Sequence, residues 1–340
     1  MSATAEAKTR ERGARTSRPT LANYWHPIAR SEDVVEQPKQ FELLNEKICA
    51  FRTQHGVSAF KDLCIHRGTA LSLGWVTEGR ITCAYHGWQY DAAGACVKIP
   101  SLPEGATIPR KARAIAYRAE ERYGLVWVAM DEPVAPIPEF PHGEWDDPSF
   151  RGFLSSTYVW RSSAGRSVEN FMDVSHFPFV HEGLLGSRDK TVIDETDVVE
   201  TDYGLYYMYE QEEPNELHGG GGGQPTRWEY HLYTPFTIHL TKTVGDEKTL
   251  ISLASAPTQP KLTHMYLFIV RNYQLDEDDR AFKDFSDTIM EQDRVIVESQ
   301  RPEEIPTDLR DELHLKVPDA SGIAYRRLLG RIDQVTPFLP

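Results

Sequence analysis

Two short stretches, Cys64-Ile-His66-Arg-Gly68 and Cys83-Ala-Tyr-His86-Gly87-Trp88, decide how the first part of this chain folds. Each stretch contributes one cysteine and one histidine, and 16 residues separate His66 from Cys83. Four such ligands on two short loops indicate a metal site. Zinc accepts two cysteines and two histidines, but its structural sites usually pair ligands of one kind. A mixed pair on each loop instead suits two unlike irons, one bound by two thiolates and the other by two imidazoles.

We therefore predict a [2Fe–2S] cluster of the Rieske type, bound by Cys64, His66, Cys83 and His86, with a structural zinc site as the alternative. The surrounding residues, from about 25 to 130, form short β-rich runs punctuated by turns, which is typical of a small all-β domain. Asp91-Ala-Ala-Gly94, between two such runs, predicts a hairpin.

Length and charge bound the possible functions. The chain has 340 residues and a formal net charge of −14, which argues against nucleic acid or an anionic membrane as its main partner. No apolar stretch is long enough for a transmembrane helix. Four cysteines are too few for a disulfide framework, and we expect a cytoplasmic protein. A proline-rich segment near residues 131–148 suggests three parts: a disordered tail (1–20), the cluster domain (21–140) and a second domain (141–340).

A second group of ligand-type residues occurs in the stretch that runs from Asn170 to His181. Asn170, Asp173 and His176 are three residues apart, so a helix over 166–175 would place them along one face. In an unbroken helix His181 would point about 140° away from His176. Pro178 lies between the two histidines and disfavours helical geometry in the residue before it. A bend there is expected to return His181 to the same ion.

The third ligand is predicted on a helix over residues 278–300, where Phe282, Phe285, Ile289 and Ile296 form an apolar stripe. Asp293 falls on that stripe, and a buried carboxylate costs several kcal/mol unless it is paired or binds a metal. Two histidines and one carboxylate leave positions open for dioxygen on Fe(II). We therefore predict a mononuclear iron site formed by His176, His181 and Asp293. Asp173 is expected to accept the far N–H of His176, and Asn170 to support the ligands from behind.

These motifs resemble those of the Rieske-type non-haem iron oxygenases, the terminal components of ring-hydroxylating and demethylating systems. The similarity extends to residues 24–29 and 121–127, to the Asn-x-x-Asp-x-x-His-x₄-His pattern, and to the segment 292–300. Within the family, residues 173–183, 297–300 and 324–327 are most similar to methylxanthine N-demethylases and guanidinium-toxin hydroxylases. The resemblance implies an α+β protein, in which an N-terminal all-β Rieske domain precedes a catalytic domain of antiparallel sheet plus helices.

The resemblance also implies how electrons travel. NAD(P)H would supply them through a separate reductase or ferredoxin, and dioxygen would be the co-substrate. In a head-to-tail homotrimer, Asp173 would bond His86 of the neighbouring subunit and bridge the two metal centres. We expect monooxygenation of a small ring compound, as hydroxylation or as oxidative N- or O-demethylation. Ring cis-dihydroxylation is the first alternative, and a Rieske electron-transfer protein without oxygenase activity is the second.

Two weaker expectations concern surfaces. Residues 60–122 contain 9 basic and 6 acidic residues, so Lys61, Arg67, Lys98 and Arg110 are predicted to steer an acidic ferredoxin-type partner. The aromatic residues between 228 and 271 suit either a ring-binding pocket or a hydrophobic core, and for each residue taken singly we favour the core.

Overall fold

The structure is a computed structural model, and it describes residues 18–212 and 225–333. Its strands form three antiparallel sheets, and its longer helices all lie after residue 163, so the predicted α+β class is confirmed. None of the helices within the described ranges combines the length and the apolar character that a membrane-spanning helix needs.

The N-terminal part contains two of the three sheets. Six strands pair in the order β1-β10-β9-β4-β3-β2, and four short strands pair as β5-β6-β7-β8. The bounds are β1 His26–Arg30, β2 Lys39–Leu43, β3 Glu46–Thr53, β4 Gly56–Lys61, β5 Trp75–Thr77, β6 Arg80–Thr82, β7 Gln89–Tyr90, β8 Cys96–Lys98, β9 Ala116–Arg122 and β10 Leu125–Ala129. The predicted hairpin joins β7 to β8, where the Asp91 carboxylate accepts hydrogen bonds from the backbone N–H groups of Ala93 and Ala95.

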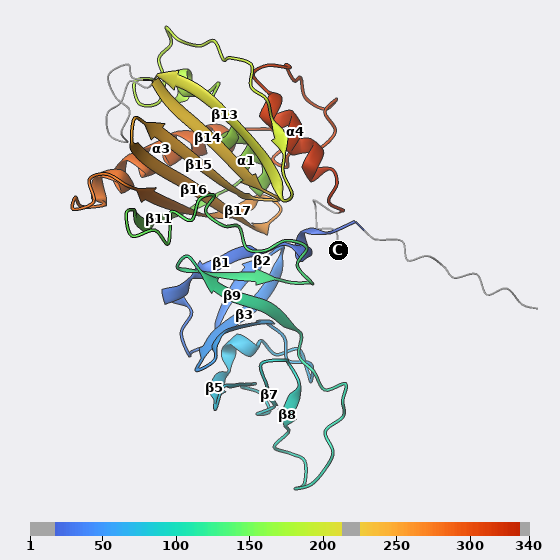
Figure 1. Cartoon of the computed structure of the whole chain (residues 1–340). Coiled ribbons are helices and arrows are strands. Elements are labelled where there is room, and N and C mark those ends of the chain that lie inside the picture. The colour runs from blue at the N-terminus through green and yellow to red at the C-terminus, as the bar shows by residue number, and fades with distance from the viewer. Residues whose placement is uncertain (1–17, 213–224, 334–340) are drawn as a thin grey trace, which may run out of the picture.

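The C-terminal part is one seven-stranded sheet with helices against one face. The strand order is β11-β17-β16-β15-β14-β13-β12, with every neighbouring pair antiparallel. The bounds are β11 Arg151–Trp160, β12 Val199–Glu200, β13 Gly204–Glu212, β14 Pro225–Tyr233, β15 Thr237–Val244, β16 Glu247–Gln259 and β17 Leu262–Arg271. The helices are α1 Ala164–Met172, α2 Phe177–Val180, α3 Arg280–Val297 and α4 Ala320–Leu329, and Figure 1 shows α1, α3 and α4 gathered beside this sheet.

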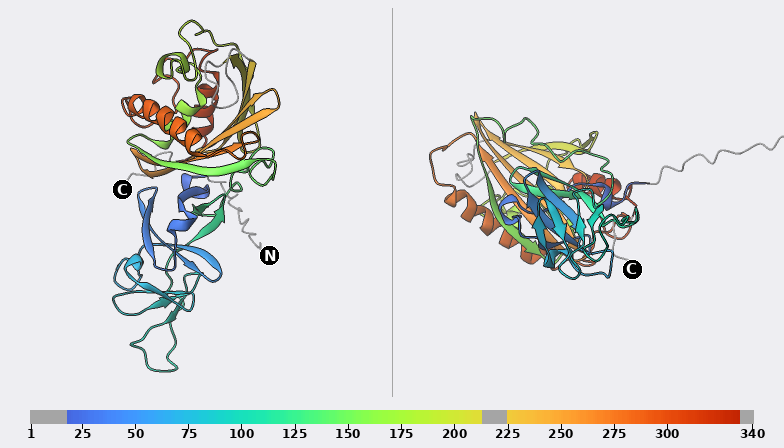
Figure 2. Two further views of the ribbon diagram at one scale, coloured as in Figure 1. Left: turned by 90° about the vertical axis from the view of Figure 1, so that its left-hand side faces the viewer. Right: turned by 90° about the horizontal axis from the view of Figure 1, so that it is seen from below.

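One continuous core joins the two parts. Leu43, Ile48 and Val126 of the six-stranded sheet belong to the same buried cluster as Trp160 and Leu253 of the seven-stranded sheet. The four-stranded sheet has its own core and lies at the far end of the molecule, away from the helices, in Figure 1 and in the left view of Figure 2.

The predicted disordered tail, residues 1–20, extends too far along the chain. Residues 1–17 lie outside the described part of the chain, but Thr20 forms a parallel β-bridge with Asp333. The backbone N–H of Asp333 also donates to the carbonyl of Pro19. Residues 19 and 20 are therefore part of the folded structure, because their backbone groups are paired with the end of the described chain.

Helix α3 also differs from its predicted orientation. Its buried residues are Phe282, Ser286, Met290, Asp293 and Val297. At about 100° per residue, this face is rotated from the predicted apolar stripe, and Ile296 is 45% exposed. Ser286 fits inside because its hydroxyl donates to the Phe282 carbonyl, which removes the cost of burying it. Asp293 lies on the buried face under either description, with 6% of its surface exposed.

Candidate metal centres

The first candidate centre lies on two loops with the same backbone pattern. The N–H of Cys64 donates to the Thr69 carbonyl, and the N–H of Gly68 donates back to the Cys64 carbonyl at 2.8 Å. Cys83 repeats the pattern with Trp88 and Gly87, at 2.9 and 3.0 Å. Gly68 and Gly87 have φ values of 72° and 69°, which glycine adopts without strain. Each loop therefore turns back on its own cysteine.

The four predicted cluster ligands meet at the tips of these loops. Both thiols are buried, whereas His86 is exposed and its ring centroid lies 4.5 Å from that of His66. The His66 ring stacks on Trp88, and its Nδ1 atom is buried without a hydrogen-bond partner among the described residues. Burial raises the pKa of Cys83, so a cation beside this thiol would favour its ionisation. Two thiols and two imidazoles, one of which has an unpaired nitrogen, fit a Rieske-type cluster.

Tyr90 adds a hydrogen bond that the sequence did not reveal. Its hydroxyl lies 3.1 Å from the sulfur of Cys64, and the side chain is fully buried at the end of β7. Burial, together with the neighbouring thiols, raises the pKa of Tyr90 above its usual range. The phenol therefore keeps its proton and would donate it to the sulfur once that sulfur is a cluster-bound thiolate. No spacing rule marks this residue, since the contact depends on how β7 packs beneath the first loop.

The second candidate centre begins where α1 ends. Ser163 caps α1 by accepting a hydrogen bond from the N–H of Arg166, and Asp173 is the residue at which the helix stops. His176 precedes the short helix α2, and His181 follows it. The predicted bend at Pro178 is wrong. The helix breaks earlier, at residues 173–176, and Pro178 sits in the first turn of α2, where its missing N–H costs no hydrogen bond.

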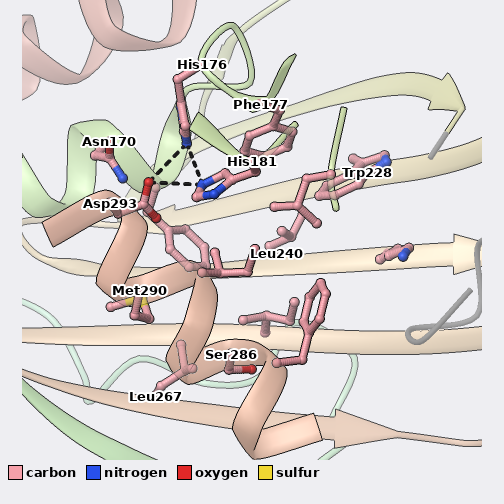
Figure 3. Close-up of a pocket in the computed structure, with 16 residues that line it drawn as sticks. Asn170, His176, Phe177, His181, Trp228, Leu240, Leu267, Ser286, Met290 and Asp293 are labelled. Carbon is pink, nitrogen blue, oxygen red and sulfur yellow. Dashed lines mark hydrogen bonds and ion pairs between the residues drawn. The ribbon is translucent and has the colours of Figure 1, made fainter. Parts of the chain in front are cut away.

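The structure brings His176, His181 and Asp293 together, as Figure 3 shows. Nε2 of His181 lies 3.0 Å from Oδ1 of Asp293, and Nε2 of His176 lies 3.4 Å from the same oxygen. The two Nε2 atoms are 3.2 Å apart. Ligands at right angles on one metal, with bonds of about 2.1 Å, are separated by about 3 Å. The spacing and chemistry of these three side chains therefore fit a single non-haem Fe(II).

Electrostatics at this centre favour a cation. Burial by itself disfavours the charged form of His176, but its hydrogen bonds to Asp173 and Asp293 raise its pKa to about 9. For Asp293, burial raises the pKa, and the bonds from the two histidines outweigh it and lower the value to about 2. Without a metal, a proton on His176 supplies the positive charge that the carboxylates require. A bound metal ion would replace that proton.

Each histidine has a partner on its other ring nitrogen. Nδ1 of His176 lies 2.8 Å from Asp173, whose carboxylate also accepts the backbone N–H groups of Ser175 and His176. Nδ1 of His181 lies 2.7 Å from Oε1 of Gln292. The residue patterns predicted the first contact but not the second. The only signal for Gln292 was its position next to Asp293.

Asn170 lies on α1 beside the carboxylate of Asp293 in Figure 3. The structure gives its amide no hydrogen bond to His176 or to Asp293. It lines both hollows that border the centre, so its predicted support of the ligands stays a prediction.

Two hollows border the centre. A mostly apolar cavity lies between the sheet and α3. Its lining includes Phe177, Trp228, Leu240, Ile251 and Met290, as well as the three candidate ligands. Trp228 is the aromatic residue from the 228–271 region that lines it. A second, polar groove lies on the other side of His176, lined by Asp173, Gln300, Glu312 and His314 among others.

The two centres are far apart within one chain. The loops of the first centre lie beside the four-stranded sheet, and the second centre lies among α1, α2 and α3 at the opposite end (Figures 1 and 2).

Among the predicted docking residues, Lys61 pairs with Glu46 at 2.8 Å, whereas Arg67, Lys98 and Arg110 are exposed.

Comparisons with known proteins match both parts of the chain to described domains. Residues 24–112 match the Rieske [2Fe–2S] domain, and residues 160–333 match the vanillate O-demethylase oxygenase C-terminal domain. The chain is 31% identical to methylxanthine N1-demethylase NdmA of Pseudomonas putida, over 92% of this chain and 90% of that protein. It is 29% identical to methylxanthine N3-demethylase NdmB of the same species, over 84% and 83%. The solved structure of NdmA with caffeine superposes with a TM-score of 0.82 at 30% identity, over 91% and 90% of the chains.

Proposed function

The chain belongs to the Rieske non-haem iron oxygenases, and from that premise we propose that it is a terminal oxygenase that inserts one oxygen atom into a C–H bond of a small ring compound. Hydroxylation of an N- or O-methyl group would release the methyl carbon as formaldehyde. The observation that carries the proposal is the convergence of His176, His181 and Asp293 at one wall of a mostly apolar cavity.

Each cofactor would be held by its own residues. Cys64, His66, Cys83 and His86 would hold the [2Fe–2S] cluster, and His176, His181 and Asp293 the mononuclear iron. When bound, the cluster supplies electrons one at a time, and the ferrous ion supplies the position at which dioxygen is activated. The electrons come from NAD(P)H through a separate reductase or ferredoxin.

The remaining residues of the centre orient the ligands and exclude water. Asp173 accepts the ring N–H of His176, which leaves Nε2 of that ring free to bind a metal. Phe177, Leu240 and Ile251 keep the cavity apolar, so that a bound ring displaces water. The flat face of Trp228 suits an aromatic or heteroaromatic ring, because offset stacking favours planar partners.

The distance between the centres leads us to propose that electrons cross between chains. His86 is exposed at the tip of the cluster domain, and Asp173 and His176 line an open groove at the other end of the molecule. A head-to-tail homotrimer would place His86 of one subunit in the groove of the next, with Asp173 as the bridge. Leu313, 89% exposed beside this groove, would be covered in such an assembly.

A mixed trimer tests this route. One subunit type would carry Cys83→Ser, which removes a cluster ligand, and the other His176→Ala, which removes an iron ligand. Each homotrimer should be inactive, and trimers purified through two different tags should recover part of the activity. Inactive mixed trimers with full metal content in the unaltered sites would contradict transfer between subunits.

Oxygen uptake coupled to a substrate panel tests the reaction itself. Methylated purines and methoxylated benzoates would be supplied with NADH and a reductase, and dioxygen consumption compared with formaldehyde release. One formaldehyde per dioxygen supports demethylation. Two labelled oxygens from ¹⁸O₂ in one product would instead support ring dihydroxylation, which the same ligand set can serve. A metal analysis finding two irons per chain rather than three would indicate an electron carrier.

A further inference from the structure

We infer that Gln292 is a positioning residue of the iron centre, which holds His181 in its ligand tautomer while adding no charge. The inference rests on the proposed function, because it assigns a role toward the iron that His181 would bind. Gln292 does not itself reach the point between the three ligands. It acts through the ring of His181.

Metal binding by Nε2 of His181 admits only one hydrogen-bond arrangement at the other ring nitrogen. A neutral imidazole has one N–H, and Nε2 of His181 faces His176 and Asp293 at 3.2 and 3.0 Å. Nε2 can bind a metal only if the proton is on Nδ1, which lies 2.7 Å from Oε1 of Gln292. The Nδ1–H group of His181 then donates to the amide oxygen of Gln292. If the amide NH₂ group faced the ring instead, Nε2 would carry the proton and could not be a ligand.

The two histidines are thus held by different chemical groups. His176 has the carboxylate of Asp173, at the edge of the polar groove. His181 is fully buried and has a neutral amide. With Asp173 and Asp293 ionised, their two negative charges balance a ferrous ion. A carboxylate at position 292 would make the same hydrogen bond but leave an unbalanced charge in a buried site, which is costly.

Helix α3 positions the ligand and the partner together. Gln292 and Asp293 are consecutive residues on it, so any shift of the helix moves both. The start of α3 is held by Asp279, whose carboxylate accepts hydrogen bonds from Arg151 at 2.9 Å and from Arg271 at 2.7 Å. Arg271 is fully buried and lies over the ring of Phe282. The sheet therefore sets the position of α3 and, through it, the orientation of His181.

Metal binding to three variants tests the inference. The proteins would be purified with the cluster intact, as judged by its visible spectrum, and with the mononuclear iron removed. Titration with Co(II) would then be followed by the d–d absorption of the filled site. Gln292→Leu should weaken binding about 10- to 100-fold, the usual cost of removing a partner from a ligand histidine. Gln292→Glu should bind Co(II) at least as tightly as the wild-type protein does. Its carboxylate oxygen still accepts the hydrogen bond from Nδ1 of His181.

Gln300→Leu is the matched control, since Gln300 lines the groove and does not contact His181. This variant should bind Co(II) with wild-type affinity. Iron provides the charge readout: the Fe(III) to Fe(II) affinity ratio should rise at least about tenfold in Gln292→Glu and stay constant in Gln292→Leu.

Wild-type affinity in Gln292→Leu, or equal weakening in Gln292→Leu and Gln292→Glu, would overturn the positioning role. An unchanged Fe(III) to Fe(II) ratio in Gln292→Glu would overturn the charge argument. A wild-type protein that binds no Co(II) at this centre would instead refute the proposed iron site, which separates the two failures.

Discussion

Replacing Tyr90 by phenylalanine is expected to lower the reduction potential of the cluster. The fully buried hydroxyl lies 3.1 Å from the sulfur of Cys64 and would donate to it when that sulfur is a cluster-bound thiolate, and phenylalanine keeps the ring while removing only that donor. A hydrogen bond to a thiolate grows stronger as the cluster gains negative charge, so its loss penalises the reduced state more than the oxidised one.

The size of the shift follows from the strength of one hydrogen bond. A net contribution of about 1 kcal/mol corresponds to roughly 45 mV for a one-electron couple, since 59 mV is a factor of ten in the equilibrium constant. We therefore expect Tyr90→Phe to lower the potential by about 30–60 mV. Transfer of electrons from the partner should slow, because the driving force for reducing the cluster falls.

A redox titration followed by EPR of the reduced cluster measures this shift directly. Tyr85→Phe is the control, because the Tyr85 side chain is 62% exposed beside His86, and its hydrogen bond to Cys83 comes from the backbone N–H, which the substitution keeps. An unchanged potential in Tyr90→Phe, with intact cluster content, would refute the argument. An equal shift in Tyr85→Phe would show that aromatic packing rather than the hydrogen bond sets the potential.

Three further predictions concern electron delivery, acid stability and docking. Asp173→Asn removes the negative charge beside His176, so iron and cluster contents should stay near wild type while single-turnover electron transfer slows about 10- to 100-fold; stopped-flow spectroscopy at the wild-type rate would contradict the bridging role. Burial lowers the pKa of His26 to about 4, against the opposing effect of its hydrogen bond to the Leu21 carbonyl, whereas the unfolded chain takes up this proton near pH 6.5. The free energy of unfolding should therefore fall by about 2 kcal/mol for this group between pH 7.5 and pH 5, and urea titrations of His26→Gln should show a correspondingly smaller decrease. Reduction by an acidic ferredoxin should slow as salt is added and lose that salt dependence in an Arg67→Glu, Arg110→Glu variant; a wild-type rate that ignores ionic strength would show that these charges do not steer docking.

The cluster domain was predictable from the sequence because its ligands are local. Cys64 and His66 are two residues apart, and Gly68 follows His66 by two more. Short-range turn geometry alone therefore brings the cysteine and the histidine to one loop tip. The second loop repeats this arrangement, and the match to the Rieske domain confirms the prediction of the family. Local loop geometry does not depend on the distant parts of the chain.

The second centre was predictable only in part. Residue types and spacing indicated His176, His181 and Asp293, and the structure brings these side chains within a few ångströms of one another. The place of the helix break was wrong, because Pro178 is tolerated in the first turn of α2. The buried face of α3 was also misplaced, because hydrophobic periodicity does not count a serine that bonds its own helix as a core residue.

The residue pattern alone therefore indicated which side chains are candidates for binding iron, in which two groups they lie, and on which type of element. The tertiary structure decided what those groups meet. Tyr90 reaches Cys64, and Gln292 reaches His181 across 111 positions of sequence, only because separate elements pack together. Residue type and spacing are enough to predict candidate ligands. Their hydrogen-bond partners and the cavity walls depend instead on packing between distant segments, which no local pattern encodes.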